Sequence, residues 1–382
     1  METRKLYYED CHMGSFTAAV TGCEQTAKGW QVTLDATAFY PEGGGQACDT
    51  GTLNEAQVLD VRERGGEVIH LCDKPLEIGQ QVLGTIDWSR RFDLMQQHTG
   101  EHILSGLIHA KYGYHNVGFH MGKEAVEVDF DGPIPAEGLA ELERLANEAV
   151  WANLPVKCWI PAPEELGGVT YRSKKALDWP VRIVQVPGYD SCACCGVHTA
   201  HTGEVGIIKI LSCVKFHEGV RLEMLCGRKA YEYLCRVYEQ NKLVSQCFSA
   251  KVLQTGEAAR QMADQLTAEK YRSAGLEKRV FQSIAEGFAG QGDVVHFEEG
   301  LTPGSVRELA DTVAQTCGGI AAVFSGAEGS YSMCLIAKQQ DVKELGTALT
   351  KALNGRGGGK PGCFQGSVKA TRSQIEEFFR SR

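Results

Sequence analysis

Two pairs of metal-binding side chains, about ninety residues apart, constrain this chain more than any other feature. His98 and His102 lie four residues apart in an apolar stretch over residues 92–108, which predicts a helix with both imidazoles on one face. Cys194 and His198 repeat that spacing after a predicted strand. Imidazole nitrogens and a thiolate are ligands that zinc takes. The sequence therefore predicts a fold that brings both segments together around one Zn²⁺ ion.

The exact ligand set stays open at this level. Cys192, Cys195 and His201 are near enough in sequence to replace Cys194 as ligands. Four protein ligands are also more typical of a structural zinc site than of a catalytic one. We therefore expect one of the four ligands to bind weakly or to lie outside the direct coordination shell, and we select His198.

Glu101 allows a second interpretation of the same helix. His98, Glu101 and His102 fit His-x-x-Glu-His, a signature of zinc peptidases in which the glutamate is the general base. The alternative for Glu101 is an ordinary ion pair with a nearby lysine or arginine. The sequence offers no obvious acidic third-ligand helix downstream, whereas it does offer the Cys/His pair. This favours the Cys/His site over a peptidase. Glu101 is kept as a candidate catalytic residue because it lies beside His102 in the sequence.

Hydrophobic patterning predicts an α+β multidomain protein with four segments. Residues 1–88 consist mostly of predicted strands and are expected to form an N-terminal β-barrel. Helices and strands mix without strict alternation over residues 89–227, which indicates an α+β zinc-binding domain. Residues 228–290 predict two long helices that form a hairpin spacer, and residues 291–382 predict a C-terminal α/β domain.

Charge and composition restrict the class of protein. A net charge of −9 argues against general electrostatic binding to nucleic acid or membrane, so such contacts require a local basic patch. The first residues form no apolar signal segment and no apolar run has transmembrane length, so we expect a cytoplasmic protein without a membrane partner. Fifteen scattered cysteines then indicate reduced thiols, a few of them metal ligands.

Two glycine-rich segments are further candidate sites. Residues 39–46 end in three glycines followed by Gln46, whose amide can donate and accept hydrogen bonds close to the backbone. The alternative is a tight turn within the barrel. Residues 351–372 contain five Lys/Arg and no Asp/Glu, in or beside glycine-rich loops that suit phosphate contacts or are simply solvated. The candidate phosphate-binding residues are Arg356, Lys360, Lys369 and Arg372.

Taken in order, these motifs resemble the editing half of alanyl-tRNA synthetase. They are Phe-Tyr-Pro-Glu-Gly-Gly-Gly-Gln at residues 39–46, His-Thr-x-x-His at 98–102, Cys-x-Gly-x-His at 194–198 with Thr-Gly at 202–203, and Gly-Gly-Gly-Lys-Pro at 357–361. The resemblance covers nearly the whole chain, but the aminoacylation domain is missing. The chain is therefore most similar to the free-standing alanyl-tRNA editing proteins of the long AlaX type.

The resemblance implies zinc-dependent hydrolysis of serine, and also glycine, from wrongly charged tRNA(Ala). It implies that Gln46 contacts the substrate and that the C-terminal domain binds tRNA. It also implies that the zinc ligands are His98, His102, Cys194 and His198. A synthetase site shaped for alanine cannot strongly reject slightly larger or smaller amino acids, so a second hydrolytic site is useful. We also expect a homodimer through the C-terminal half. Two rivals remain, a zinc peptidase and a non-catalytic tRNA-binding module with a structural zinc.

Two positions depart from the synthetase pattern. Glu101 stands where the synthetase commonly has threonine, and Gly196-Val197 stands where it commonly has a glycine-threonine pair. The first departure removes a threonine hydroxyl that would contact serine. Glu101 is then expected either to supply that contact or to act as a base.

Overall fold

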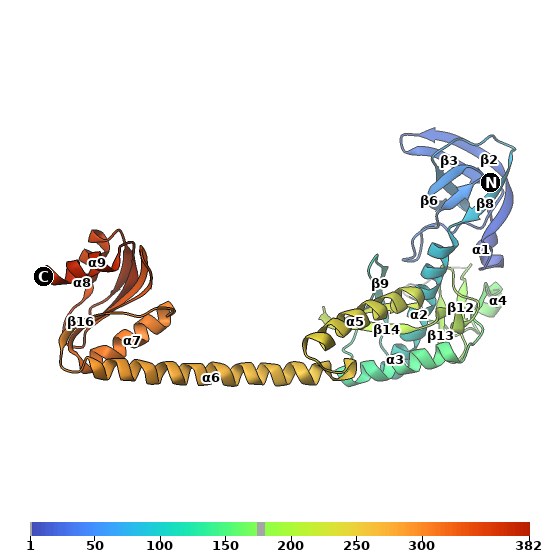
Figure 1. The fold of residues 1–382 in the computed structure, drawn as a ribbon. Coiled ribbons are helices and arrows are strands. Elements are labelled where there is room, and N and C mark those ends of the chain that lie inside the picture. Colours follow the sequence, from blue (N-terminus) through green and yellow to red (C-terminus); the bar gives the residue numbers. More distant parts are fainter. Residues whose placement is uncertain (1, 174–179) are drawn as a thin grey trace. The chain divides into compact units, whose positions relative to one another are not determined.

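The computed structural model describes residues 2–173 and 180–382 and shows a mixed α/β multidomain protein with several sheets (Figure 1). The chain divides into two compact units, Met1–Leu243 and Val244–Arg382. Their border falls within helix α5 (Gly227–Cys247), inside the segment that the sequence assigns to a helical hairpin. The other long helix of that segment, α6 (Thr255–Gly287), belongs to the second unit. The hairpin and the four-segment division therefore stay predictions.

Six antiparallel strands of the first unit close into a barrel in the order β2, β3, β7, β6, β5, β8. Their bounds are Ser15–Thr26 (β2), Gly29–Leu34 (β3), Gly51–Leu53 (β5), Ala56–Arg64 (β6), Glu67–Cys72 (β7) and Gln81–Ile86 (β8). Burial alternates along β8, as it does in a small barrel whose interior is filled by side chains. Beside the barrel lie β1 (Arg4–Lys5), β4 (Ala36–Thr37) and the short helix α1 (Leu6–Glu9).

Helix α2 (Trp88–Tyr112) follows the last barrel strand directly and carries the first ligand pair. Asp87 caps its start by accepting a hydrogen bond from Arg90 N at 3.1 Å, and Gly113, with a φ of 75°, ends it. Most residues from 94 to 106 are buried, polar ones included. A helix at a protein surface buries only one face. Because α2 is enclosed, its polar side chains must be satisfied inside the protein, which positions them with little freedom.

The rest of the first unit packs around α2. A four-stranded sheet has the order β14, β15, β10, β9, and a three-stranded sheet has the order β11, β12, β13. The bounds of the strands are Asn116–Met121 (β9), Val126–Phe130 (β10), Lys157–Trp159 (β11), Ile183–Val186 (β12), Asp190–Ala193 (β13), Ile208–Phe216 (β14) and Gly219–Cys226 (β15). The helices are α3 (Ala136–Trp151), α4 (Pro163–Leu166) and a 3₁₀ turn at Thr202–Val205. Ile103 and Leu104 of α2 share a core with Leu142 of α3 and Leu222 of β15, which fixes the helix against the larger sheet.

The second unit has a five-stranded sheet in the order β16, β17, β18, β20, β19, in which only the β16–β17 pair is parallel. Its elements after α6 are β16 (Gly292–Phe297), α7 (Pro303–Thr316), β17 (Gly318–Ala327), β18 (Ser330–Ile336), α8 (Lys343–Ala352), β19 (Arg356–Lys360), β20 (Cys363–Val368) and α9 (Arg372–Arg380). The end of α6 and helix α7 share one core, while α8 and α9 share another.

The predicted glycine-rich loop of the second unit is in fact an edge strand, β19, paired antiparallel with β20. Glycines carry no side chains, so this strand lacks the alternation by which strands are recognised in a sequence. A Cβ atom on Gly359 would lie 2.0 Å from the carbonyl oxygen of Cys363, so the close pairing needs glycine there. In the described part of the chain, no helix has the length and apolar character needed to cross a bilayer.

Candidate metal centre

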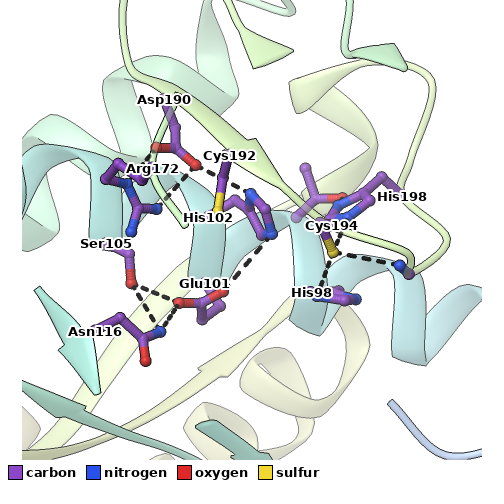
Figure 2. Close-up of polar contacts among 12 residues, drawn as sticks. His98, Glu101, His102, Ser105, Asn116, Arg172, Asp190, Cys192, Cys194 and His198 are labelled. Carbon is purple, nitrogen blue, oxygen red and sulfur yellow. Dashed lines mark hydrogen bonds and ion pairs between the residues drawn. The ribbon is translucent and has the colours of Figure 1, made fainter. Parts of the chain in front are cut away.

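The four predicted ligands, His98, His102, Cys194 and His198, lie together in the first unit (Figure 2). Each offers one ligand atom, and these atoms all lie within 4.8 Å of one another. Cys194 Sγ is 3.4 Å from His98 Nε2 and 3.5 Å from His198 Nε2. Two ligands come from α2 and two from the segment that follows β13. Three imidazole nitrogens and a thiolate in this arrangement form a set that could bind a metal such as zinc.

Every imidazole of the set is held at Nδ1 by another side chain. His98 Nδ1 lies 2.8 Å from Gln46 Oε1, and His102 Nδ1 lies 3.0 Å from Asp190 Oδ2. The hydroxyl of Thr99 is 3.3 Å from His198 Nδ1, the longest of the three contacts. An acceptor at Nδ1 fixes the proton there and leaves Nε2 with a free lone pair, as in known metal sites. The donor set thus fits a divalent metal.

Asp190 connects His102 to a partly buried arginine. Arg172 Nε donates to Asp190 Oδ1 at 2.7 Å, and Arg172 Nη2 donates to Asp190 Oδ2 at 3.0 Å (Figure 2). Burial alone would raise the pKa of Asp190, but the hydrogen bonds and charges of His102 and Arg172 lower it below its usual range. The carboxylate therefore stays ionised and holds His102 in one orientation.

Electrostatics at the centre favour the ligand forms of Cys194 and His198. Burial alone would raise the pKa of the Cys194 thiol, but the charge of His98 and hydrogen bonds from the three imidazoles bring it well below its usual range. Burial, together with the charge of His98, holds the pKa of His198 well below its usual value. A thiolate and a neutral imidazole are the forms in which these side chains bind metals.

Close packing fixes the loop that carries Cys194. A Cβ atom on Gly196 would lie 2.1 Å from His98 Cε1, so any other residue there would displace that imidazole. Gly196 N also donates to Cys194 Sγ at 3.3 Å. Arg182 Nη1 donates to the carbonyl oxygens of Cys194 at 2.9 Å and of Gly196 at 2.8 Å. These contacts with backbone atoms help to hold the loop in place.

Gln46 reaches the centre on the loop between β4 and β5. Arg91, fully buried on α2, donates to both oxygens of Asp49 and to Ala38 O, and Tyr40 N also donates to Asp49. This network fixes the loop to α2. Gln46 Oε1 accepts from His98 Nδ1 and, at 3.2 Å, from Val197 N, so the glutamine joins both ligand segments. Its Nε2 is buried and has no hydrogen-bond partner among the described residues.

Glu101 is buried and has hydrogen bonds but no ion pair with lysine or arginine within the described chain. Ser105 Oγ and Asn116 Nδ2 donate to its Oε1, the latter at 2.6 Å. Its Oε2 lies 4.0 Å from His102 Nε2. Among residues 2–173 and 180–382, its hydrogen-bond partners are neutral donors and its nearest charged neighbour is a candidate ligand, so the ordinary ion pair with lysine or arginine is not seen there.

A cavity of about 340 Å³ opens beside the ligand set. Its lining includes His98, Glu101, His102, Asn116, Phe119, Arg172 and Cys194, together with Gly44 and Gly45 of the glycine-rich loop. The ring of Phe119 stacks on His98 with 5.2 Å between ring centres. The cavity thus joins the metal ligands, one buried carboxylate and an aromatic wall.

The alternative ligands lie outside the set formed by His98, His102, Cys194 and His198, and the basic candidates lie in the second unit. Cys192 groups with His102 and Asp190, while Cys195 and His201 are exposed. In the second unit, all four basic candidates are exposed: Arg356, Lys360, Lys369 and Arg372. Arg356 and Lys360 mark the two ends of β19, whereas Arg372 pairs with Glu376 at 2.9 Å and covers the Phe297 ring at 4.6 Å. Arg372 is therefore less available to a phosphate than the other three.

Sequence reasoning missed the side chains that support the ligands. Asp190, Arg172, Thr99 and Asn116 were not candidates, although each contacts a ligand or Glu101, or orients a group that does. Asp190 had a weak signal, because it begins the strand that ends directly before Cys194. Arg172 and Asn116 had no such signal, since no local sequence pattern relates them to helix α2.

Three family models match the chain. Residues 3–90 match the tRNA synthetases class II (A), residues 181–223 the threonyl and alanyl tRNA synthetase second additional domain, and residues 290–381 the DHHA1 domain. Alanine–tRNA ligase of Thermofilum pendens is 31% identical over 97% of this chain and 43% of its own length. The alanyl-tRNA editing protein Aarsd1-A of Xenopus laevis is 28% identical over 96% of this chain and 92% of its own.

A third relative is the alanyl-tRNA editing protein Aarsd1 of Danio rerio, which is 28% identical over 98% of this chain and 96% of its own length. The chain thus spans less than half of the ligase relative but nearly all of the editing proteins. The resemblance inferred from the motifs is confirmed, and the chain is related along nearly its whole length to the alanyl-tRNA editing proteins and to the corresponding part of alanyl-tRNA synthetase.

Proposed function

We propose that this protein hydrolyses the ester of tRNA(Ala) that has been charged in error with serine, and also with glycine. One observation carries the proposal: three of the four candidate ligands, His98, His102 and Cys194, line a cavity of about 340 Å³, and each imidazole of the set is anchored at Nδ1. The names of the full-length relatives, alanyl-tRNA editing proteins, support tRNA(Ala) as the partner.

The chain's own residues have separate tasks in this proposal. His98, His102, Cys194 and His198 would hold a zinc ion, which when bound supplies Lewis-acid polarisation of a carbonyl and acidifies water. Gln46 keeps His98 in the tautomer that presents Nε2. The Nε2 of Gln46, which has no hydrogen-bond partner among the described residues, is assigned as a donor for a substrate oxygen. A hydrogen bond to the ester inside the cavity is stronger than in bulk solvent, because the effective dielectric constant inside a protein is lower.

A deacylation assay on seryl-, glycyl- and alanyl-tRNA(Ala) tests the proposal. We expect release of serine and glycine but not of alanine, and loss of the activity with a chelator. Cys194→Ala should lower zinc content and activity together, while Cys195→Ala, a matched control one residue away, should keep its zinc. Full zinc content in Cys194→Ala would contradict the ligand set.

Two further variants separate the two rival functions. A zinc peptidase would cleave peptides without any tRNA and would lose that activity in Glu101→Gln. With a purely structural zinc, His98→Ala would unfold the first unit instead of leaving a folded, inactive protein. Circular dichroism and thermal unfolding of His98→Ala decide between these outcomes.

The second unit is proposed to bind tRNA through its exposed basic residues and to pair with a second copy. On α6, Met262, Leu266, Leu276 and Val280 are about half exposed, which is unusual for large apolar side chains. They form a stripe that is symmetric about Tyr271, since the first two mirror the last two along the sequence. Two antiparallel copies of α6 would therefore place apolar residues opposite apolar residues.

Sedimentation of the full chain tests this pairing. We expect a dimer at micromolar concentration that Leu266→Lys converts to a monomer, while the control Lys278→Glu, on the same helix but outside the stripe, stays dimeric. A wild-type monomer would refute the pairing and would favour the alternative, in which α5 of the same chain covers the stripe as in the predicted hairpin.

A further inference from the structure

A buried carboxylate that pairs with no lysine or arginine of the described residues lines the cavity next to the ligand set. Glu101 is 4% exposed, and Ser105 and Asn116 donate hydrogen bonds to its Oε1. Its Oε2 lies 4.0 Å from His102 Nε2, and within residues 2–173 and 180–382 no lysine or arginine pairs with it. Figure 2 shows Glu101 between the Ser105–Asn116 pair on one side and His102 on the other.

The orientation of this carboxylate is fixed. A carboxylate oxygen only accepts hydrogen bonds, so the amide of Asn116 must turn its Nδ2, at 2.6 Å, toward Glu101. Ser105 lies one helical turn after Glu101 on α2 and holds the same oxygen. Both anchors act on Oε1, which leaves Oε2 to face the candidate ligands and the cavity.

A buried negative charge is costly unless it is paired and hydrogen-bonded. The two neutral donors satisfy one oxygen of Glu101 only. The second oxygen thus has the properties of a receptor for a cation that arrives with the substrate. This step rests on the proposed function, because the substrate of that function, an aminoacyl ester, carries such a cation.

The α-ammonium group of an aminoacyl ester is separated from the ester carbonyl by a single carbon atom. A carbonyl held near His102 therefore brings the ammonium within reach of Glu101, the residue next to His102 in sequence. Serine and glycine esters share this ammonium, whereas only serine has a hydroxyl. The ammonium carries a full positive charge and the hydroxyl carries none, so Coulomb attraction makes the carboxylate prefer the ammonium to the hydroxyl.

We propose that Glu101 Oε2 binds the α-ammonium group of the aminoacyl ester and that the cavity thereby selects esters with a free amine. An N-acylated ester, such as that of a peptidyl-tRNA, has a neutral amide nitrogen at this position and cannot form the charged contact. The site would then remove a wrong amino acid and leave esters with a blocked amine intact.

Binding of two stable substrate analogues tests this proposal. The probes are adenosine with an L-seryl group joined to the 3′ position through an amide, and the N-acetyl form of the same compound. Calorimetry with the zinc-loaded full-length protein should give a preference for the free amine of about tenfold to a hundredfold, the range of a hydrogen bond to a charged group. Because the amide is not hydrolysed, the measurement is independent of catalysis.

Three variants complete the test. Glu101→Gln should weaken binding of the free-amine compound about tenfold to a hundredfold and leave the N-acetyl compound unchanged. Glu101→Asp, which keeps the charge on a shorter side chain, should retain part of the preference. Glu124→Gln removes an exposed glutamate in the turn between β9 and β10 and should behave as wild type. Zinc content is measured for each variant.

The outcomes that overturn the proposal are distinct. Equal binding of the two compounds by wild type refutes the ammonium contact alone, because a deacylase without it remains possible. Unchanged binding but abolished hydrolysis in Glu101→Gln makes the residue a base instead of a receptor. Lost zinc in Glu101→Gln would assign it to the metal centre. If wild type binds neither compound, both this inference and the proposed function are overturned.

Discussion

Asp190 offers the sharpest test of how the candidate metal centre is built. Asp190→Asn keeps the shape of the side chain but removes its charge. One hydrogen bond, to His102 Nδ1 at 3.0 Å, then no longer fixes the tautomer that presents Nε2. Loss of such a supporting partner typically lowers metal affinity about 10–100-fold, which is about 1.4–2.7 kcal/mol. Arg172 also loses a partner that it contacts at 2.7 and 3.0 Å.

The unpaired arginine predicts a second, separable effect. The Asp190 side chain is 1% exposed and that of Arg172 is 16% exposed, so removing one partner should lower the free energy of unfolding of the zinc-free protein by about 3–5 kcal/mol. In the Asp190→Asn background, Arg172→Met should restore part of this stability because no buried charge is left alone. It should not restore the zinc affinity, which depends on His102.

Two measurements test the predicted effects on zinc affinity and on stability. Zinc affinity is obtained by competition with a chromogenic chelator, and stability is obtained by urea unfolding of the zinc-free protein. If Asp190→Asn binds zinc as tightly as wild type, the orientation of His102 does not limit the site and the reasoning is refuted. If the double variant recovers zinc affinity together with stability, the loss came from unfolding and not from the imidazole.

Three further predictions concern other parts of the chain. Gly196→Ala should displace His98, since its Cβ atom would lie 2.1 Å from that ring, and should lower zinc content in a metal assay; a variant with full zinc would contradict the packing. Burial lowers the pKa of His70 to about 4, so the folded barrel keeps it neutral, whereas the unfolded chain takes up its proton near pH 6.5. The free energy of unfolding of the first unit should therefore fall by up to about 3 kcal/mol as the pH falls from 6.5 to 4. Urea unfolding of His70→Gln should show a smaller loss over the same pH range. An equal loss would show that His70 is not the group responsible. Arg356→Ala and Lys360→Ala should each reduce the salt dependence of tRNA binding by about one phosphate contact, and an unchanged slope would remove these residues from the interface.

The sequence carried strong information wherever function depends on spacing along one element. His98 and His102 must share a helix face because four residues complete one turn, and no tertiary contact can change that. The motif order was enough to recognise the relatives that match nearly all of the chain. The mixture of helices and strands was also predictable, because buried apolar residues recur about every 3.6 residues in a helix and about every second residue in a strand.

Tertiary structure decided the partners of these residues. The edge strand β19 was mistaken for a loop, because glycines leave no pattern of side chains. The supporting residues Asp190, Asn116 and Arg172 lie 88, 15 and 18 residues from the groups they hold, so local sequence says nothing about them. The hydrogen-bond partners of Glu101 were not predictable for the same reason, since they are set by packing around α2.

The sequence by itself determined which side chains are candidate metal ligands and which family their motifs resemble, because chemistry and helical spacing are properties of the chain. Only the folded first unit decided how those side chains are oriented, since the imidazoles are anchored by hydrogen bonds with Gln46, Asp190 and Thr99, which are distant in the sequence from the histidines they hold. It also decided that Glu101 remains unpaired by lysine or arginine at a cavity wall within the described residues. A buried charge acquires its role from its surroundings, and those surroundings exist only after folding.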